Sequence, residues 1–328
     1  MFNKREILNE LIQVFKKNLS NLDSVLLAGS FSRNEESFLQ ISSNLIVPLS
    51  DIEFIIFQNT KDYFLGGKLQ KLSSQLGELS IKFGIKIDFS IKPKISLYLT
   101  PNTFFWYETF LTGRIVFGAL KLPNIKHVNQ GDVYEILNHS IISLLLKQQH
   151  DNDNFVKYQI LKASLDLLIP LLYCGNKTIA THTLRYKTFL KMCDQLNLSK
   201  DVLKLLEHSY NVKCKQVIIS NVFLSSLDQE FLIKNYLIFS RCIFELVNSK
   251  KCKMGDTSMM RKIHQLKLSI KYRDNKFLNK KRMLCNVYEL NYSYLSGDDN
   301  ELIKDFFAIG KIDFKNTMHI NKLIYRYL

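Results

Sequence analysis

The arrangement of hydrophobic and polar residues predicts alternating helices and strands in the first part of the chain. Apolar side chains over residues 7–15 recur every three to four positions, which is the spacing of an amphipathic helix. Ser24–Ala28 and Asp51–Phe57 are short, nearly continuous apolar runs of the length of buried strands. Ile85–Lys92 alternates between apolar and polar positions, and we predict a third strand there.

The segments between and after these strands add further elements. Lys61–Phe83 has mainly helical spacing, with Gly66-Gly67 as an interruption or a turn near its start. We predict a short helix within Pro101–Phe110 and a further strand within Gly113–Leu120. Together these elements predict an α/β (α+β) domain with a small mixed sheet over residues 1–126, which is an ordinary domain size.

The pattern changes after residue 129. Several segments then have helical spacing with few β-branched residues, and Asn, Asp or Gly residues separate them. These segments are Asp132–Gln149, Asn154–Cys174, Thr183–Leu196 and Gln229–Asn248. We therefore predict a boundary near Lys126–Gln130, followed by a mostly α-helical C-terminal domain over residues 127–328.

The chain is strongly basic. Its 328 residues include 45 Lys and Arg against 30 Asp and Glu, which gives a net charge of +15. Such a surface attracts polyanions, namely nucleotides, nucleic acid or anionic lipid. The alternative explanation is compositional, because the chain is rich in Lys, Asn, Ile and Phe.

Cysteine content and hydropathy limit the class of protein. The six cysteines are widely scattered and form no CxxC pair, which argues against a zinc site and a disulfide framework. Reduced thiols in a cytosolic protein are the simplest explanation. The charged N-terminus does not resemble a signal peptide, and the apolar segments 136–146 and 160–173 are too short to span a bilayer. We therefore expect a cytoplasmic protein without membrane contact.

The end of the first predicted strand is a candidate binding motif, because residues 26–35 read LLAGSFSRNE. A Gly-Ser pair at the start of a helix leaves free backbone N–H groups, and Gly29 lets an anionic ligand approach them closely. The Ser30 hydroxyl adds a donor, and Arg33 lies where a cation could meet the same anion. This segment predicts a phosphate-binding site.

Three carboxylates in the next two predicted strands require an explanation. Asp51 and Glu53 are two residues apart in a strand, so both project from one face, while Ile52 points toward the core. Two adjacent carboxylates repel each other, and a divalent cation between them removes the repulsion. Asp88 lies inside an apolar strand, where a shared metal would also explain it. The alternative is structural, with Asp51 capping a turn and the other two acids on solvent-exposed faces.

In their order along the chain, GSFSRNE and SDIEF resemble the signature of the DNA polymerase β-type nucleotidyltransferase superfamily. In that superfamily an apolar strand precedes Gly-Ser, the next strand carries Asp-apolar-Asp/Glu, and a later strand supplies a third acid. The form here, with Gly29, Ser30, Arg33 and Glu35, is most similar to the minimal nucleotidyltransferases and their antibiotic-modifying relatives. The resemblance covers about the first 90 residues. A helical second domain is compatible with it.

The resemblance implies a nucleotidyltransferase-like N-terminal domain and a role for each motif residue. Gly29 and Ser30 would hold the phosphates of an NTP substrate. Asp51 and Glu53 would bind two Mg²⁺ ions, with Mn²⁺ as a possible replacement. Asp88 would bind the catalytic ion and act as, or orient, the base for the attacking hydroxyl. Two metals would stabilise the attacking and leaving oxygens of an in-line displacement at the α-phosphorus.

The sequence departs from the family pattern at two points. Asn34 stands where Gly is common, which is tolerable because Asn also accepts left-handed backbone angles. The connection Glu36–Ser50 is longer than that of the compact members, and Leu45–Val47 within it could be an extra strand or a hairpin arm. This longer connection leaves the subfamily open.

The second half contains a candidate phosphate-binding lysine on a predicted helix. Lys162 lies within an otherwise apolar stretch, and some relatives use a basic residue of the helical domain to hold the triphosphate. The alternative is a lysine that extends its charge to solvent from a partly buried helix. Arg185 is a weaker candidate for the same role.

Residues 250–282 form a strongly basic segment, with twelve Lys and Arg against two Asp. Apolar and basic residues alternate over residues 266–273, which would give one basic face. Such a face could contact an RNA backbone or another polyanion. A solvated cationic face with no partner is the alternative.

The combined interpretation is a magnesium-dependent nucleotidyltransferase that moves an NMP from an NTP to an acceptor hydroxyl and releases pyrophosphate. The helical domain would select the acceptor and close the cleft. The acceptor could be a small molecule, a protein, a nucleotide or RNA, and the motif form favours the first two. Two alternatives remain: a catalytically silent nucleotide-binding sensor or antitoxin-like protein, and a basic RNA-binding module in which the acids are structural.

Overall fold

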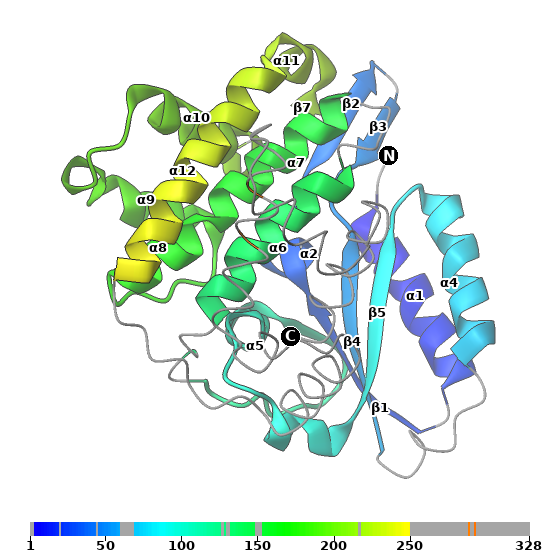
Figure 1. Cartoon of the computed structure of the whole chain (residues 1–328). Helices are drawn as coiled ribbons and strands as arrows, with labels where there is room; N and C mark the ends of the chain where they lie inside the picture. Colours follow the sequence, from blue (N-terminus) through cyan, green and yellow to red (C-terminus); the bar gives the residue numbers. More distant parts are fainter. Residues whose placement is uncertain are drawn as a thin grey trace, which may run out of the picture. The chain divides into compact units, whose positions relative to one another are not determined.

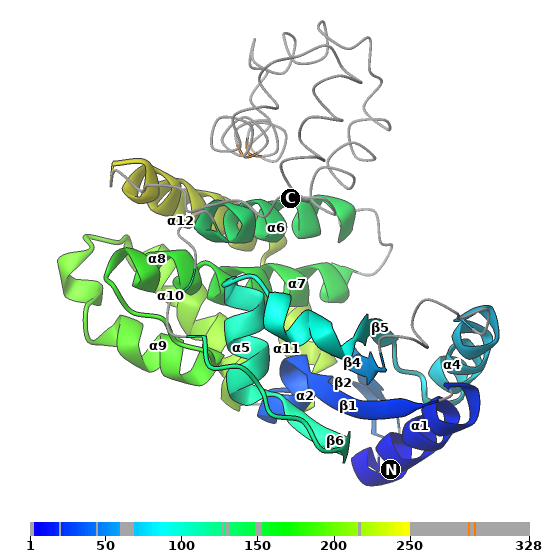
Figure 2. The ribbon, with the colours of Figure 1, turned by 90° about the horizontal axis from the view of Figure 1, so that it is seen from below.

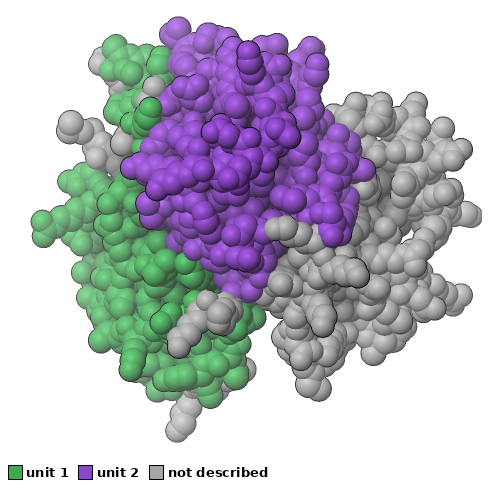
Figure 3. Space-filling view, turned by 90° about the vertical axis from the view of Figure 1, so that its left-hand side faces the viewer, with its two compact units in different colours: residues 1–127, 213–221 green, residues 128–212, 222–328 purple. Residues whose placement is uncertain are grey.

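The computed structural model describes residues 3–19, 21–43, 45–59, 69–125, 128, 132–147, 153–215, 218–249, 288 and 292. These residues fall into two compact units (Figure 3). Unit 1 comprises the described members of residues 1–127 and 213–221, and unit 2 comprises those of 128–212 and from 222 onward.

Unit 1 contains the predicted mixture of strands and helices (Figure 1). Its elements are α1 (Lys4–Asn18), β1 (Leu22–Ala28), α2 (Gly29–Arg33), β2 (Phe38–Ser42), β3 (Leu45–Pro48), β4 (Ile52–Gln58), α4 (Leu69–Phe83), β5 (Ile87–Pro93), the 3-10 helix η1 (Lys94–Leu99), α5 (Phe104–Thr112), β6 (Arg114–Gly118) and β7 (Ile218–Ser220). The predicted strands within residues 24–28, 51–57, 85–92 and 113–120 are confirmed as β1, β4, β5 and β6.

The main sheet of unit 1 has the strand order β5-β4-β1-β6. β1 runs antiparallel to both β4 and β6, whereas β4 and β5 are parallel. In this register Ala28 lies opposite Glu53, and Glu53 lies beside Asp88. The predicted small mixed sheet is therefore confirmed.

Both faces of this sheet are covered. Val25 and Leu27 of β1 pack in the core cluster formed with α1 and α4, which lie together on one face (Figures 1 and 2). Leu26 and Ala28, which point the other way, pack with residues of η1 and α5. Because neither face of β1 meets solvent over Val25–Ala28, these residues form a continuous apolar run instead of an alternating one.

Helix α1 is determined by its N-terminal cap and its apolar stripe. The Asn3 side chain accepts a hydrogen bond from the Glu6 backbone N–H at 3.3 Å, which satisfies one donor of the first turn. Leu11 and Phe15 are fully buried, and the Phe15 ring packs edge-to-face on Phe54 with centroids 5.2 Å apart. This contact attaches α1 to the strand that follows Asp51.

A second, three-stranded sheet has the order β3-β2-β7. β2 and β3 form an antiparallel hairpin, so the long connection Glu36–Ser50 folds as a hairpin that contains Leu45–Val47. β7 pairs in parallel with β2, with Phe38 beside Ile218. The sequence reading did not include β7, because its three residues are too few to produce a periodic pattern.

Unit 2 is mostly helical, as predicted. Its elements are α6 (Asp132–Lys147), α7 (Asp153–Asp166), α8 (Leu168–Cys174), α9 (His182–Leu190), the 3-10 helix η2 (Cys193–Gln195), α10 (Lys200–Tyr210), α11 (Asn221–Ser226) and α12 (Gln229–Ser249). A π-helical turn, η3 (Asn211–Lys215), follows α10. Among the described residues, no helix combines the length and the apolar character that crossing a membrane requires.

Two of the helices predicted in this unit are shorter in the structure. Asn154–Cys174 is interrupted at Leu167, because Pro170 has no N–H to donate to the carbonyl of Asp166. The helix predicted over Thr183–Leu196 ends at Leu190, where the following N–H groups bond to carbonyls only three residues back. That tighter bonding is typical of a last helical turn.

Some predicted features lie outside the described residues. They are the basic segment 250–282, the start of the helix predicted over Lys61–Phe83 with its Gly66-Gly67 pair, and most of the predicted boundary Lys126–Gln130. The remainder of that helix is confirmed as α4.

Replacement of Phe15 by Ala tests the packing of α1 on the sheet. Phe15→Ala should destabilise the protein by about 3–5 kcal/mol, because it removes a fully buried ring and leaves a cavity. Ile81→Ala is the control, because Ile81 of α4 is 84% exposed and its truncation should cost less than about 0.5 kcal/mol. Urea unfolding followed by circular dichroism measures both, and equal losses would contradict the packing described here.

Candidate functional site

The Gly-Ser turn, Gly29–Ser30, joins β1 to the one-turn helix α2. Gly29 has φ +65°, and a Cβ atom built on it would lie 2.5 Å from the Glu53 Oε1 atom. Glycine is favoured here, since an L side chain would be strained at this φ and the Glu53 carboxylate would have to move to make room for it. The turn therefore lies directly against the Glu53 carboxylate.

The turn closes with the left-handed residue that the sequence predicted. Asn34 has φ +56°, which confirms that Asn replaces Gly there at little cost. The Glu35 N–H donates to the Ser30 carbonyl at 3.0 Å, and the Ser32 hydroxyl donates to the Gly29 carbonyl at 2.8 Å. These bonds hold the segment as a compact turn at the end of β1.

The three-acid cluster, Asp51, Glu53 and Asp88, comes from two neighbouring strands. Asp51 immediately precedes β4, Glu53 is its second residue, and the parallel register sets Asp88 beside Glu53. Ile52 is buried in the core under α1 and α4, so the alternation of the strand directs the acids to the opposite face. The expectation that Ile52 points into the core is confirmed.

Lys86 contacts two members of this cluster. Its Nζ lies 3.7 Å from the Asp51 Oδ2 atom and donates a short hydrogen bond to the Asp88 carboxylate. Partial burial lowers the pKa of Lys86, but the bond to Asp88 and the charges of Asp88, Asp51 and Glu53 outweigh it, so the pKa is raised. An ammonium thus lies in the combined field of all three carboxylates.

The fit of a divalent cation depends on donor type and on spacing. Carboxylate oxygens are the ligands that Mg²⁺ prefers, and the Lys86 ammonium lies against those of Asp51 and Asp88. Among the described residues, however, no group of three His, Cys, Asp or Glu side chains is arranged to hold a metal ion. Metal binding would therefore require the acids to draw closer together.

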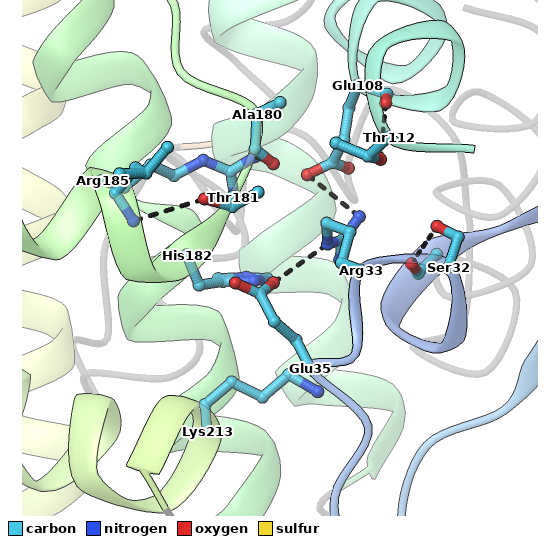
Figure 4. Close-up of polar contacts among 12 residues, drawn as sticks. Ser32, Arg33, Glu35, Glu108, Thr112, Ala180, Thr181, His182, Arg185 and Lys213 are labelled. Carbon is cyan, nitrogen blue, oxygen red and sulfur yellow. Dashed lines mark hydrogen bonds and ion pairs between the residues drawn. The ribbon is translucent and has the colours of Figure 1, made fainter. Parts of the chain in front are cut away.

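Arg33 is a buried ion-pair partner in this structure. Its Nε bonds to Glu35 at 2.9 Å and its Nη1 lies 3.2 Å from Glu108, with the Arg33 side chain only 6% exposed (Figure 4). Burial lowers the pKa of Arg33, but the charges of Glu108 and Glu35 outweigh it and leave the pKa raised. Arg33 therefore connects α2 to α5, and its predicted contact with phosphate stays a prediction.

Lys213 is a buried cation that the sequence reading missed. It comes from the π-helical turn η3, is 3% exposed, and its Nζ lies 3.3 Å from Ser50 Oγ and 3.5 Å from Ser37 Oγ. The Ser50 hydroxyl also accepts the Ser37 backbone N–H at 3.0 Å. Lys213 thus supports the residue directly before Asp51, from a point 163 residues further along the chain than Ser50.

The two basic candidates of unit 2 have different surroundings. Arg185 is 1% exposed and donates to the carbonyls of Ile179 and Ala180 at 2.8 and 2.7 Å. It therefore bonds to the segment that directly precedes its own helix, α9. Asp166 pairs with His182 at 3.0 Å; burial raises the Asp166 pKa, but His182, Lys162 and Arg185 together hold it well below its usual range. Lys162 therefore acts electrostatically on Asp166 within unit 2, and its nucleotide-binding role stays a prediction.

Comparisons with known proteins add a likeness of structure. No model of a known protein family matches the chain, and no curated protein sequence matches it. A solved structure that it resembles is a spectinomycin adenyltransferase from Enterococcus faecialis, crystallised with ATP and spectinomycin. The likeness covers 74% of this chain and 100% of that chain, with 14% sequence identity and a TM-score of 0.41. Any conclusion about the chemistry of this chain therefore rests on its own residues.

Replacement of Gly29 by Ala tests the close approach of the turn to Glu53. Gly29→Ala should destabilise the protein by about 1–3 kcal/mol, because the new methyl group is strained at φ +65° and displaces the carboxylate. Gly77→Ala in α4 should instead stabilise by about 0.5–1 kcal/mol, since it adds a methyl group to a helix with no atom within 4 Å. Thermal melting distinguishes the two, and a neutral Gly29→Ala variant would contradict the geometry.

Replacement of Arg33 by Met tests whether Arg33 is a structural ion-pair partner. Arg33→Met should cost about 3 kcal/mol of stability, because it removes the cation that pairs with the buried Glu35 carboxylate and the half-buried Glu108 carboxylate. Lys82→Met, which breaks an exposed pair with Glu10, should cost at most about 1 kcal/mol. An Arg33→Met variant that unfolds like the wild type in urea would rule out this structural role.

Proposed function

We propose that the chain is a metal-dependent nucleotidyltransferase. It would move a nucleoside monophosphate from an NTP to an acceptor hydroxyl and release pyrophosphate. The observation that supports this most directly is the position of Glu53, which lies beside Asp88 through the pairing of β4 with β5 and against Gly29 through the pairing of β4 with β1. A Gly-Ser turn and three acids from two neighbouring strands thus lie at one end of a sheet.

The turn and the three-acid cluster would have separate roles in the reaction. Gly29 and Ser30 would bind the phosphates of the NTP through backbone N–H groups and the Ser30 hydroxyl. Asp51, Glu53 and Asp88 would hold Mg²⁺, or Mn²⁺ in its place. When bound, the metal supplies positive charge beside the phosphate oxygens.

Asp88 is the best candidate for the acid that receives the proton of the acceptor. Its side chain is 46% exposed, against 30% for Asp51, so an acceptor hydroxyl can reach it more easily. The acceptor oxygen would form a bond to the α-phosphorus as the bond from that phosphorus to the bridging oxygen breaks. The hydroxyl proton would pass to Asp88, and pyrophosphate would leave.

We assign selection of the acceptor to the helical domain, residues 127–328, with Lys162 as a candidate contact for the triphosphate. The motif form favours a small molecule or a protein as acceptor over a nucleotide or RNA. The basic segment 250–282 remains a candidate contact for a polyanion. We also propose that the two functions divide at residue 126, with catalysis assigned to residues 1–126 and acceptor selection to residues 127–328.

A catalytically silent nucleotide-binding protein is the second candidate. The observation that favours it is the pairing of Lys86 with Asp51 and Asp88, which compensates part of the charge that a metal would otherwise neutralise. Such a protein would bind nucleotide, or a partner, as a sensor without transferring any group. Retention of all three acids favours the enzyme.

A transfer assay distinguishes these two functions. Purified protein with Mg²⁺ is incubated with each α-labelled NTP in turn, in the presence and absence of a cell extract as acceptor source. Label should move to an acceptor with one preferred NTP, with pyrophosphate released. Asp88→Asn should reduce the rate about a hundredfold or more, the usual contribution of a general base.

The controls identify which part of the proposal fails. Asp51→Asn and Glu53→Gln should abolish transfer, whereas Glu10→Gln, an exposed carboxylate of α1, should leave it unchanged. Nucleotide binding that needs the three acids, without any transfer, would favour the sensor. Absence of both binding and transfer would reject the nucleotide site.

A further inference from the structure

The three-stranded sheet β3-β2-β7 exposes large aliphatic side chains. They are Ile41 of β2, Leu45 and Ile46 of β3 and Ile218 of β7, and each is 43–50% exposed. Single exposed side chains of this kind are ordinary on a protein surface. Four of them on one small sheet are typical of a surface that binds another protein.

The outer strand of this sheet, β3, also lacks charge. Residues 37–50 contain no Lys, Arg, Asp, Glu or His, although charged residues make up 23% of the chain. The outer strands of the main sheet are different, because β5 carries Asp88 and Lys92 and β6 carries Arg114. Charged side chains on an outer strand discourage pairing with a further strand, and β3 has none of them.

The backbone of β3 favours one position for a further strand. In the described part of the chain, β3 pairs with β2 alone. The Leu49 N–H donates to the Ser37 carbonyl at 2.8 Å, so the alternation of an antiparallel pair directs the N–H and carbonyl of Ile46 away from β2. Pro48, two residues on, has no N–H to donate on that side. Pairing with a further strand is therefore strongest when it is centred on Ile46.

A second copy of this chain fits this edge. Elsewhere on the surface two copies would repel each other, since each chain carries a net charge of +15. Two β3 strands placed antiparallel bring together the same apolar side chains and the same lack of charge, so no like charges face each other across the pair. A contact made by the same surface of both copies is closed, because it uses up the β3 edge of each chain.

We propose that β3 pairs antiparallel with β3 of a second copy, so that the two hairpins form one sheet in the order β7-β2-β3-β3-β2-β7. Ile46 lies opposite the partner's Ile46 on the twofold axis, where the two residues exchange N–H to carbonyl hydrogen bonds. The pairing covers exposed aliphatic surface of the hairpin. This inference goes beyond the proposed function and does not depend on it, because it uses none of the three acids.

Sedimentation equilibrium of the full chain tests for this dimer. The wild type should pass from monomer to dimer at about 1–100 μM, because a contact between two hairpins is smaller than the interface of a stable complex. Higher salt should strengthen the dimer, since salt screens the repulsion between two chains of net charge +15. A wild type that stays monomeric throughout would overturn the proposal and leave the edge to a segment of another protein.

Charge substitutions at the predicted twofold axis test the register. Ile46→Lys and Ile46→Glu should each weaken the dimer at least about tenfold, because two like charges would face each other. An equimolar mixture of the two variants should form a dimer again, because Lys then faces Glu, and this recovery would show that both variants fold. Ile81→Lys, at an exposed position of α4, is the control and should dimerise like the wild type.

Two results would overturn the assignment of this edge. One is a dimer of Ile46→Lys as tight as that of the wild type, which would place the contact elsewhere on the chain. The other is a mixture of Ile46→Lys and Ile46→Glu that stays monomeric although each variant has the urea midpoint of the wild type. Transfer of nucleotide is measured separately, so neither result bears on the proposed function.

Discussion

The backbone pairing of β4 with β5 is the constraint on which the rest of the candidate site depends. Parallel strands need a crossover, and α4 provides it while packing beside α1 on one face of the sheet. The buried residues of β4 on that face, such as Ile52 and Phe54, leave only the opposite face for Asp51 and Glu53. The hydrophobic core thus determines where the carboxylates lie, and their chemistry follows from that position.

Two cations near this site illustrate how solvent exposure changes the role of a charge. Arg33 is buried between Glu35 and Glu108, where its loss would remove the cation from the buried Glu35 carboxylate. Lys86 is exposed and contacts its acids from outside, where water can replace it at little cost. The first arrangement ties α2 to α5, whereas the second contributes little to the stability of the fold.

Much of unit 1 could be predicted from the sequence because its signals are local. β1 and β4 could be predicted because they contain short apolar runs, β5 because its apolar and polar residues alternate, and the left-handed Asn34 because few residues tolerate its backbone angles. The partners of Arg33 could not be predicted, since Glu108 becomes its neighbour only through packing of α5. Lys86 could have been noticed, because it shares a strand face with Asp88, whereas nothing near Lys213 indicates Ser50 as its neighbour.

Residues 213–221 belong to unit 1, which has consequences for the synthesis and the evolution of that unit. Ser37 makes its contact with Lys213, which lies 176 residues further along the chain, and β2 pairs with β7, which comes later still. On the ribosome, the second sheet therefore stays incomplete until almost all the described helices have been synthesised. A gene rearrangement that exchanged only the first 127 residues would separate the segment before Asp51 from its supporting lysine, so the two parts of the chain are expected to evolve as one.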